Sequence, residues 1–269
     1  MSAAMSILRN SLRRPMEDYK GRGCACAPGT HEAIVRVLDH HVADKGASVL
    51  DIGAHAGALL MRFKDCGFND LTGSDLDGTR FDVPGGTFKR VELNGAFAGE
   101  FGRQFDIITC TDVIEHLDSP RNFMIEARKL LKPNGWLAIS MPNIAFWEGR
   151  VKFALNGELW GFGERNYKLQ RHISPMTRSQ LTLTLQELGF KPVHVETAGS
   201  FSTVWRDLLF AAPRAVFRAV GGKNVLGECL IAIAQRHEPD EDLARPVHYR
   251  ERWAGKADGI GLEHLVGQQ

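Results

Sequence analysis

Residues able to bind a ligand follow directly after the apolar run Ala47–Ile52. Asp51 lies inside the run, and Gly53, His55 and Gly57 follow it at alternate positions before a stretch of helical length. Small residues let a ligand lie against the backbone, and the free amide groups that open a helix suit a carboxylate. In open α/β sheets, turns of this kind lie at the carboxyl ends of the strands, where ligands bind. The sequence therefore predicts a site for a nucleoside-containing ligand at this turn.

The glycine spacing of this turn argues against a nicotinamide cofactor. That fingerprint needs glycine at its first, third and sixth positions, where this chain has Gly53, His55 and Ala58. We therefore disfavour a dehydrogenase. An acidic residue about 20 positions after the turn can reach ribose hydroxyls, and Asp75 meets this expectation. Asp77 is the alternative, and the simpler interpretation is that both residues only shape the turn that follows.

A second group of polar residues lies at the end of another apolar run, Phe105–Thr111. Thr111 and Asp112 end this run and by position should lie under the ligand, whereas Asp106 begins it at the opposite edge and is expected to be structural. Glu115 and His116 come next. Histidine is a common general base, but an acid here can also complement a helix dipole, and a histidine can orient a loop.

These segments resemble the motifs of class I S-adenosylmethionine-dependent methyltransferases. Asp51, Gly53 and Gly57 match the pattern D-x-G-x-G-x-G, and residues 105–117 match F-D-x-(apolar)2-x3-(apolar)2-E-H-(apolar). His55 stands where glycine is usual, so either the backbone there needs no positive φ or the imidazole edge covers the methionine end of the cofactor.

The resemblance covers residues 47–143 strongly and continues weakly to residue 236. It is similar to the branch that includes ubiquinone-biosynthesis O-methyltransferases and sugar or small-molecule methyltransferases, which implies S-adenosylmethionine as cofactor. In this branch the end of the third strand contacts the adenine. The residues expected to bind the cofactor are Asp51, Gly53, His55, Gly57, Asp75, Leu76, Glu92, Leu93, Asn94, Thr111 and Asp112.

The acceptor is expected to bind to the loops after the fifth strand. Methyl transfer from a sulfonium mainly needs alignment, and a base only if the acceptor is a hydroxyl or a protonated amine. His172 lies in a stretch that resembles the family's histidine-containing segment just before the next helix. We therefore expect His172 to be catalytic, and His116 is the second candidate. Either histidine can instead have only a structural role in packing. The residues expected to contact the acceptor are Asn143, Trp147, Arg150 and Tyr167.

Charge in two acceptor-side insertions favours an anionic acceptor. Residues 144–180 carry six basic and three acidic side chains, and residues 201–223 carry four basic and one acidic. A carboxylate, a phosphate or a nucleotide-linked sugar would suit such a surface. We expect O-methylation. N-methylation and a non-catalytic cofactor-binding partner subunit are the alternatives, since a fold does not fix a function.

The periodicity of the chain predicts the elements that position these residues. Apolar runs alternate with helix-length amphipathic stretches, which is typical of a doubly wound α/β fold with a mostly parallel sheet of seven strands. The expected strands are Ala47–Ile52, Leu71–Asp75, Thr87–Leu93, Phe105–Thr111, Trp136–Met141, Pro192–Thr197 and Gly227–Ala234. The expected helices are Glu32–Val42, Ala58–Cys66, Pro120–Leu131 and Arg178–Leu188. Lys132 to Gly135 is expected to be a turn.

These elements suggest a methyltransferase domain over residues 30–236, with acceptor-side insertions at 144–177 and 201–223. Residues 1–29 are expected to form an N-terminal arm or lid, and residues 237–269 a polar tail. The second insertion is amphipathic, which suits a lid, a dimer contact or a lipid surface, so a homodimer is left open.

Composition narrows the classes of protein to which this chain can belong. Lys and Arg number 33 against 32 for Asp and Glu, which gives no electrostatic footprint for nucleic acid. No apolar run approaches the roughly 20 residues that span a bilayer. The odd, scattered cysteines suit a reducing cytoplasm. Cys24, Cys26 and His31 supply too few ligands for structural zinc, so no metal site is expected.

Overall fold

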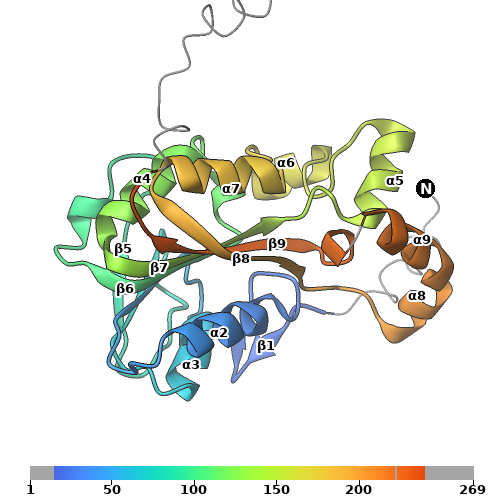
Figure 1. The fold of residues 1–269 in the computed structure, drawn as a ribbon. Coiled ribbons are helices and arrows are strands. Elements are labelled where there is room, and N and C mark those ends of the chain that lie inside the picture. The colour runs from blue at the N-terminus through green and yellow to red at the C-terminus, as the bar shows by residue number, and fades with distance from the viewer. Residues whose placement is uncertain (1–14, 222, 240–269) are drawn as a thin grey trace, which may run out of the picture.

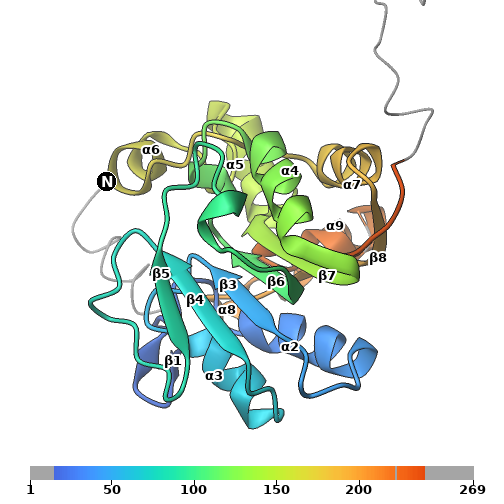
Figure 2. The ribbon, with the colours of Figure 1, turned by 90° about the vertical axis from the view of Figure 1, so that its left-hand side faces the viewer.

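A computed structural model describes residues 15–221 and 223–239 of the chain. Its main sheet has seven strands in the order β5-β4-β3-β6-β7-β9-β8 (Figures 1 and 2). The first five pair in parallel, and β9 runs antiparallel to β7 and β8. This confirms the expected doubly wound, mostly parallel fold. The strands are β3 Val49–Ile52, β4 Leu71–Asp75, β5 Thr87–Arg90, β6 Phe105–Thr111, β7 Leu131–Pro142, β8 Phe190–Ala198 and β9 Cys229–Arg236.

Two predicted strand boundaries were wrong by more than two residues. β5 ends at Arg90, because the chain then turns and the Glu92 side chain accepts hydrogen bonds from the next two amides. β7 begins at Leu131, and the expected turn at residues 132–135 is instead an irregularity within this strand. Asn134 has a φ of 61° there, so the local turn chemistry was correct although the surrounding strand was missed.

Helices cover both faces of the sheet, as expected, with α2 and α3 on one face and α4 and α7 on the other (Figure 1). Local sequence explains where two of them begin. The Ser119 hydroxyl accepts from the Asn122 amide at the start of α4, and Thr177 and Gln180 form a capping box at the start of α7. The helices are α2 Thr30–His41, α3 Ala58–Asp65, α4 Pro120–Leu130 and α7 Arg178–Glu187, all within two residues of the predicted bounds.

Two hydrophobic cores lie on opposite faces of the sheet. On β6, Ile107 belongs to the core beneath α2 and α3, and the next residue, Ile108, to the core beneath α4 and α7. Both side chains are fully buried. Successive strand residues point to opposite faces, so a strand buried on both sides needs a continuous apolar run. This is why β3 and β6 could be predicted directly from the sequence.

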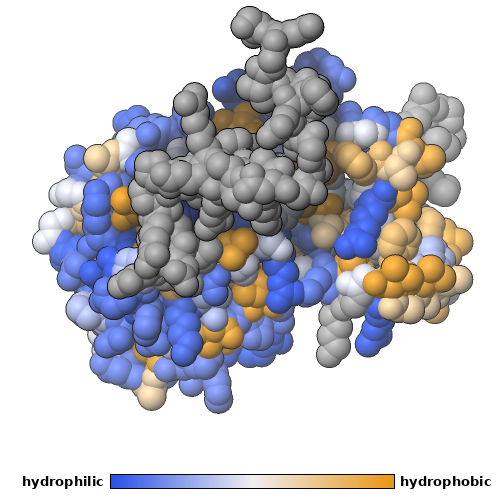
Figure 3. All heavy atoms as spheres, turned by 45° about the horizontal axis from the view of Figure 1, so that its top comes forward, coloured by the Kyte–Doolittle hydropathy of each residue, from blue (hydrophilic) through white to orange (hydrophobic). Residues whose placement is uncertain are grey.

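The two insertions pack together at one end of the sheet. The first contains α5 Trp147–Asn156 and α6 Glu164–Gln170, and the second contains α8 Val204–Leu209 and α9 Ala211–Gly221. Trp147 contacts the rings of Phe210 and Phe217 across the two insertions. Apolar side chains are also exposed at this end, among them Trp205 and Val220 (Figure 3). Among the described helices, none has the length and apolar content needed to cross a membrane.

The expected N-terminal arm includes a small hairpin of β1 Asp18–Tyr19 and β2 Arg22–Gly23. Arg22 pairs with Asp82 at 2.6 Å, and Glu17 pairs with Arg62 of α3. These ion pairs fasten the arm beside the turn after β3. Residues 1–14 of the expected arm and residues 240–269 of the expected tail lie outside the described part of the chain.

Asp106 has the structural role that its position suggested. Its Oδ2 accepts hydrogen bonds from the Ser48 amide at 2.8 Å, the Ser48 hydroxyl at 2.7 Å and Lys132 Nζ at 2.7 Å. It therefore joins the amino ends of β3, β6 and β7, at the edge opposite the ligand-binding turns.

Replacing Asp106 with alanine should lower the free energy of unfolding by about 2 kcal/mol, because hydrogen bonds to a charged group are lost. The affinity for S-adenosylhomocysteine should not change. Denaturant titration and calorimetry measure these two quantities. Asp39→Ala, which removes a surface ion pair with Lys45, is the control and should cost less than about 1 kcal/mol. Equal losses in the two variants would contradict the assignment.

Candidate cofactor and acceptor site

The turn between β3 and α3 uses left-handed backbone at three positions. The φ angles are 80° at Gly53, 46° at His55 and 85° at Gly57. One explanation offered for His55 was that the backbone there needs no positive φ. That explanation is wrong, because His55 does adopt a positive φ at this position where glycine is usual. The His55 amide donates to Asp75 Oδ2 at 2.9 Å, and its Nε2 lies 3.3 Å from a guanidinium nitrogen of Arg80. These contacts hold the residue in a conformation that L-residues seldom adopt.

Both turn glycines also make room for neighbouring side chains. A Cβ at Gly53 would lie 2.2 Å from Val113 Cγ2, and one at Gly57 would lie 2.3 Å from Val83 Cγ2. The expected reason for these glycines was close approach of a ligand. The structure adds a second reason, because the loops after β4 and β6 pack directly onto this turn.

A cavity lies between this turn and the N-terminal arm. Its lining residues are Gly23, Ala25, His31, Asp51, Gly53, Ala54, His55, Ala58 and Thr111. Three of them carry a buried polar atom without a partner: His31 Nδ1, His55 Nδ1 and Thr111 Oγ1. Buried polar atoms are normally hydrogen-bonded, so this lining fits a polar ligand such as the amino-acid end of S-adenosylmethionine. Sequence reasoning missed His31 in this role and considered it only as a zinc ligand.

Two ionisable groups of the cavity are strongly affected by burial. Burial raises the pKa of Asp51 to about 7, the Thr109 hydroxyl opposes this rise at 2.7 Å, and the negative charge of Asp75 adds to it. Burial also lowers the pKa of His31 to about 4, so this imidazole is neutral near neutral pH. A cationic amino group placed here would favour the ionised form of Asp51.

Asp75 lies at the end of β4, beside the turn. Its Oδ1 accepts from the Leu76 amide at 2.7 Å while Oδ2 accepts from the His55 amide, and a carboxylate retains further lone pairs for ribose hydroxyls. Leu76 is 54% exposed and offers apolar surface next to Asp75. Asp77 instead binds the amide and hydroxyl of Thr79. The structure thus gives Asp77 the turn-shaping role and leaves Asp75 as the ribose candidate.

The loop after β5 reaches the same edge of the sheet. Glu92 Oε1 accepts from the amides of Leu93 and Asn94, and Asn94 Oδ1 accepts from the Asp118 amide at 3.0 Å. The bond to Asp118 ties this loop to the loop after β6. The three residues expected at the adenine are therefore held next to the ligand-binding edge.

Thr111 and Asp112 face different ways. Thr111 lines the cavity, whereas the Asp112 carboxyl accepts from the Ser140 hydroxyl at 2.7 Å and lies 3.5 Å from Cys229 Sγ. Burial raises the pKa of Asp112. Its φ of 51° turns the backbone after β6, and its side chain contacts β7 and β9. Its assignment to the cofactor stays a prediction.

The structure brings the two expected catalytic histidines together. The ring centroids of His116 and His172 are 4.7 Å apart, in an edge-to-face arrangement. His116 Nδ1 lies 2.6 Å from the carbonyl oxygen of Gln170, and His172 Nδ1 lies 2.7 Å from that of Gly161. Burial lowers the pKa of His172. The imidazoles come from positions 56 residues apart (172 minus 116), so this pairing depends on the tertiary fold.

Glu115 is a functional candidate that sequence reasoning undervalued. It lies in the short 3-10 helix Ile114–His116, is fully buried, and neither carboxyl oxygen has a hydrogen-bond partner. Burial raises the pKa of this carboxyl well above its ordinary value, and the charge of Asp112 adds to the rise. A solvated acid at a helix start would show none of these features, and the motif alone did not reveal the burial.

The four residues expected at the acceptor have different surroundings. Asn143 is buried, and its amide donates to the carbonyl oxygens of Asn224 and Gly227. Trp147 is buried among aromatic rings, whereas Tyr167 is 51% exposed. Arg150 donates from Nε to the Ala145 carbonyl oxygen at 3.0 Å. The structure thus gives Asn143 and Trp147 structural contacts, and their contact with the acceptor stays a prediction.

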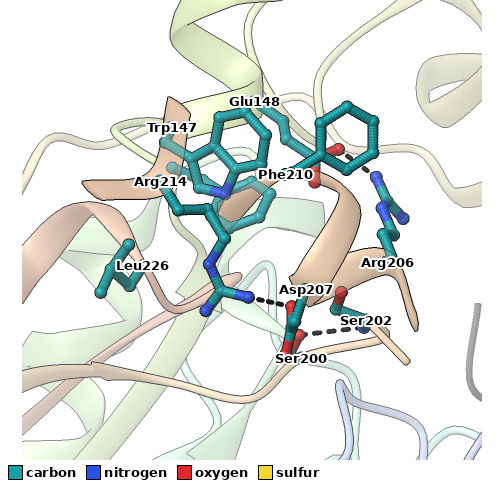
Figure 4. Close-up of a pocket in the computed structure, with 10 residues that line it drawn as sticks. Trp147, Glu148, Ser200, Ser202, Arg206, Asp207, Phe210, Arg214 and Leu226 are labelled. Carbon is teal, nitrogen blue, oxygen red and sulfur yellow. Dashed lines mark hydrogen bonds and ion pairs between the residues drawn. The ribbon is translucent and has the colours of Figure 1, made fainter. Parts of the chain in front are cut away.

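A second pocket lies between α5 and α8 (Figure 4). Trp147 and Phe210 form its apolar side, while Arg206 pairs with Glu148 and Arg214 pairs with Asp207. The arginine charges in this pocket are therefore balanced by carboxylates. The pocket therefore differs from the part of the insertions whose arginines lack a carboxylate partner and can attract an anion.

Cys24 and Cys26, weighed in the sequence as zinc ligands, lie in a small hydrophobic cluster. Cys24 and Cys26 are buried and pack with Ala58 and Tyr19. Within residues 15–221 and 223–239, the one cluster of at least three potential metal ligands is formed by other residues, Glu115, His116 and His172.

Comparison with known proteins gives the family context. The methyltransferase-domain family matches residues 23–195 of the chain. The ubiquinone biosynthesis O-methyltransferase of Coxiella burnetii is 28% identical over 119 residues, covering 42% of this chain and 50% of the relative. That of Nitrosospira multiformis is 29% identical over 114 residues, covering 39% and 47%. The chain spans about half the length of these curated relatives.

Solved structures share the fold. An S-adenosylmethionine-dependent methyltransferase from Mesorhizobium loti matches with a TM-score of 0.52 and 16% identity, covering 77% of this chain and 99% of that one. Magnesium protoporphyrin IX methyltransferase from Synechocystis, solved with S-adenosylhomocysteine bound, matches with a TM-score of 0.52 and 15% identity over 77% and 82%. At these identities the likeness concerns the fold.

Asp75→Ala should weaken binding of S-adenosylhomocysteine by at least about tenfold, because it removes a ribose acceptor and releases the His55 and Leu76 amides. Asp77→Ala removes a nearby carboxylate that only binds Thr79, and is the matched control. Calorimetry on both variants measures the difference. Parent-like affinity of Asp75→Ala would refute the ribose assignment.

Proposed function

The chain belongs to the methyltransferase-domain family, of the class I S-adenosylmethionine-dependent type, and we propose that it methylates a hydroxyl oxygen of a small anionic molecule. The donor is already an activated sulfonium, so the protein must chiefly align the acceptor oxygen, the methyl carbon and the sulfur. The carboxyl ends of β3, β4 and β6 lie side by side in the sheet and can supply the cofactor side of this alignment.

The observation that carries the proposal is the orientation of the two imidazoles. His116 Nδ1 and His172 Nδ1 each face a backbone carbonyl oxygen, which can only accept a hydrogen bond. The ring hydrogen of each neutral histidine therefore belongs on Nδ1, and Nε2 keeps its lone pair. Such a lone pair can receive the proton of an acceptor hydroxyl.

The distribution of charge supports an anionic acceptor. Within the insertions, Lys152 pairs with Glu158 and Lys168 pairs with Glu164. Arg150, Arg165 and Arg171 form no ion pair with the acidic residues of the described chain. Arg171 directly precedes His172 in the sequence. These unpaired guanidinium groups are suited to a carboxylate or phosphate.

The names of the curated relatives support a small-molecule acceptor, since they act in ubiquinone biosynthesis. We extend to this chain only the class, an organic molecule with a hydroxyl group. The chain's near-neutral net charge also gives no overall electrostatic footprint for a nucleic acid.

His172→Gln should lower kcat by about 10² to 10⁴, the usual contribution of a general base, while leaving the KM for S-adenosylmethionine unchanged. The assay measures formation of S-adenosylhomocysteine across hydroxylated carboxylates, sugar phosphates and nucleotide sugars. His40→Gln, at an exposed histidine on α2, is the control.

Mass spectrometry and NMR of the product then identify the methylated atom. A methylated nitrogen would replace the proposal with N-methylation. A protein that binds the cofactor yet turns over no acceptor would indicate a non-catalytic partner subunit.

Arg150→Gln should raise the KM for an anionic acceptor by about tenfold, as expected from loss of one charge-assisted hydrogen bond. The same variant should leave the KM for a neutral ester of that acceptor unchanged. Lys152→Gln is the control, because Lys152 is already paired with Glu158 at 2.7 Å. An unchanged KM for both acceptors in Arg150→Gln would remove the support for an anion contact at this position.

A further inference from the structure

We propose that Glu115, His116 and His172 form a binding site for a divalent metal ion. One potential ligand atom from each residue lies within 4.8 Å of those of the other two. A carboxylate and two imidazoles converge here from two separate segments, next to the carboxyl end of β6. The sequence alone led us to expect no metal site, because the ligands considered there, Cys24, Cys26 and His31, were too few.

Backbone hydrogen bonds fasten the two segments to each other. The amides of Ile173 and Ser174 donate to the Glu115 carbonyl oxygen at 2.8 and 3.0 Å. The Ser174 hydroxyl donates to the Leu117 carbonyl oxygen at 2.6 Å. His172 is therefore held beside Glu115 by its own neighbours, and the three side chains are positioned before any ion binds.

Both imidazoles have the second contact that is typical of metal-binding histidines. Their Nδ1 atoms face the carbonyl oxygens of Gln170 and Gly161. A carbonyl partner fixes the tautomer and the ring orientation and leaves Nε2 free to bind an ion. The edge-to-face contact of the rings lets the two histidines approach without stacking.

Glu115 gives the independent indication that a ligand belongs here. Its side chain is fully buried, and both carboxyl oxygens lack a hydrogen-bond partner on any other residue. Leaving a carboxyl group buried and unpartnered is costly, so such groups usually pair with a cation or a donor. No arginine or lysine of the described chain forms an ion pair with Glu115. A metal ion would satisfy this group.

The ligand set indicates the kind of ion. Two histidines and one carboxylate bind Zn²⁺ and similar transition ions, usually with a fourth position open to water or substrate. Magnesium and calcium prefer oxygen ligands, so they fit less well. We therefore infer a site for Zn²⁺ or a similar transition ion, with cobalt as a suitable spectroscopic probe.

The site also refines the proposed function, on which this consequence rests. An ion held by His116 and His172 would lower the pKa of an acceptor hydroxyl, whose proton would then pass to solvent. Without an ion, the same Nε2 lone pairs serve as bases. The metal site itself stands on the geometry of the three side chains and does not depend on which acceptor is used.

The test is a Co²⁺ titration of the tag-free full chain after chelator treatment, with neither cofactor nor acceptor present. We expect a visible absorption band that saturates at about one equivalent and is displaced by Zn²⁺. Glu115→Gln and His172→Ala should each weaken the apparent affinity by at least about tenfold. His40→Ala, the exposed histidine control, should bind as the parent does.

The parent showing no saturable band, or His172→Ala and Glu115→Gln both binding as tightly as the parent, would overturn the metal site. Thermal melts show whether each variant is folded, and Glu115→Gln preserves side-chain volume. The titration needs no turnover, so a failed titration leaves the proposed O-methylation untouched. Cobalt binding in a protein that methylates no acceptor would support the site and count only against the proposed function.

Discussion

The parallel pairing of β3 with β4 and β6 is the constraint on which the site depends. Ile52 at the end of β3 is in register with Ser74 on β4 and Cys110 on β6. Three chain segments therefore leave the sheet at one edge, and their loops must pack on one another. Gly53 and Gly57 meet this packing requirement, because side chains from the neighbouring loops fill the space where a Cβ would lie.

Some polar atoms at this edge of the sheet have no partner within the protein. The cavity beside the turn holds buried polar atoms that no protein group satisfies, among them Thr111 Oγ1 and His31 Nδ1. By contrast, Oδ2 of Asp106 at the opposite edge of the sheet accepts hydrogen bonds from Ser48 and Lys132. The carboxyl ends of the strands thus carry structural polar contacts, such as that between Asp112 and Ser140, together with buried polar atoms that remain available to a ligand.

The two insertions form the acceptor side. Some of their basic side chains are paired with carboxylates and others are not. Lys152, Lys168, Arg206 and Arg214 are paired with carboxylates within the insertions, as in the pocket of Figure 4, whereas Arg150, Arg165 and Arg171 have no carboxylate partner among the described residues. Arg171 directly precedes His172, which lies beside His116 and Glu115 after the end of β6. The likeness to ubiquinone biosynthesis O-methyltransferases covers less than half of the chain, so acceptor choice must be tested on these residues.

The sequence by itself determined the strands, the four sheet-covering helices and the family motifs around Asp51 and Glu115. Such features follow from periodicity, caps and turn residues, which act over a few positions. Only the tertiary structure decided that the Asp112 carboxyl contacts Ser140, that the chain at residues 132–135 stays within β7, and that His172 joins Glu115 and His116. These outcomes depend on side-chain direction and on hydrogen bonds between distant segments, which no local pattern encodes.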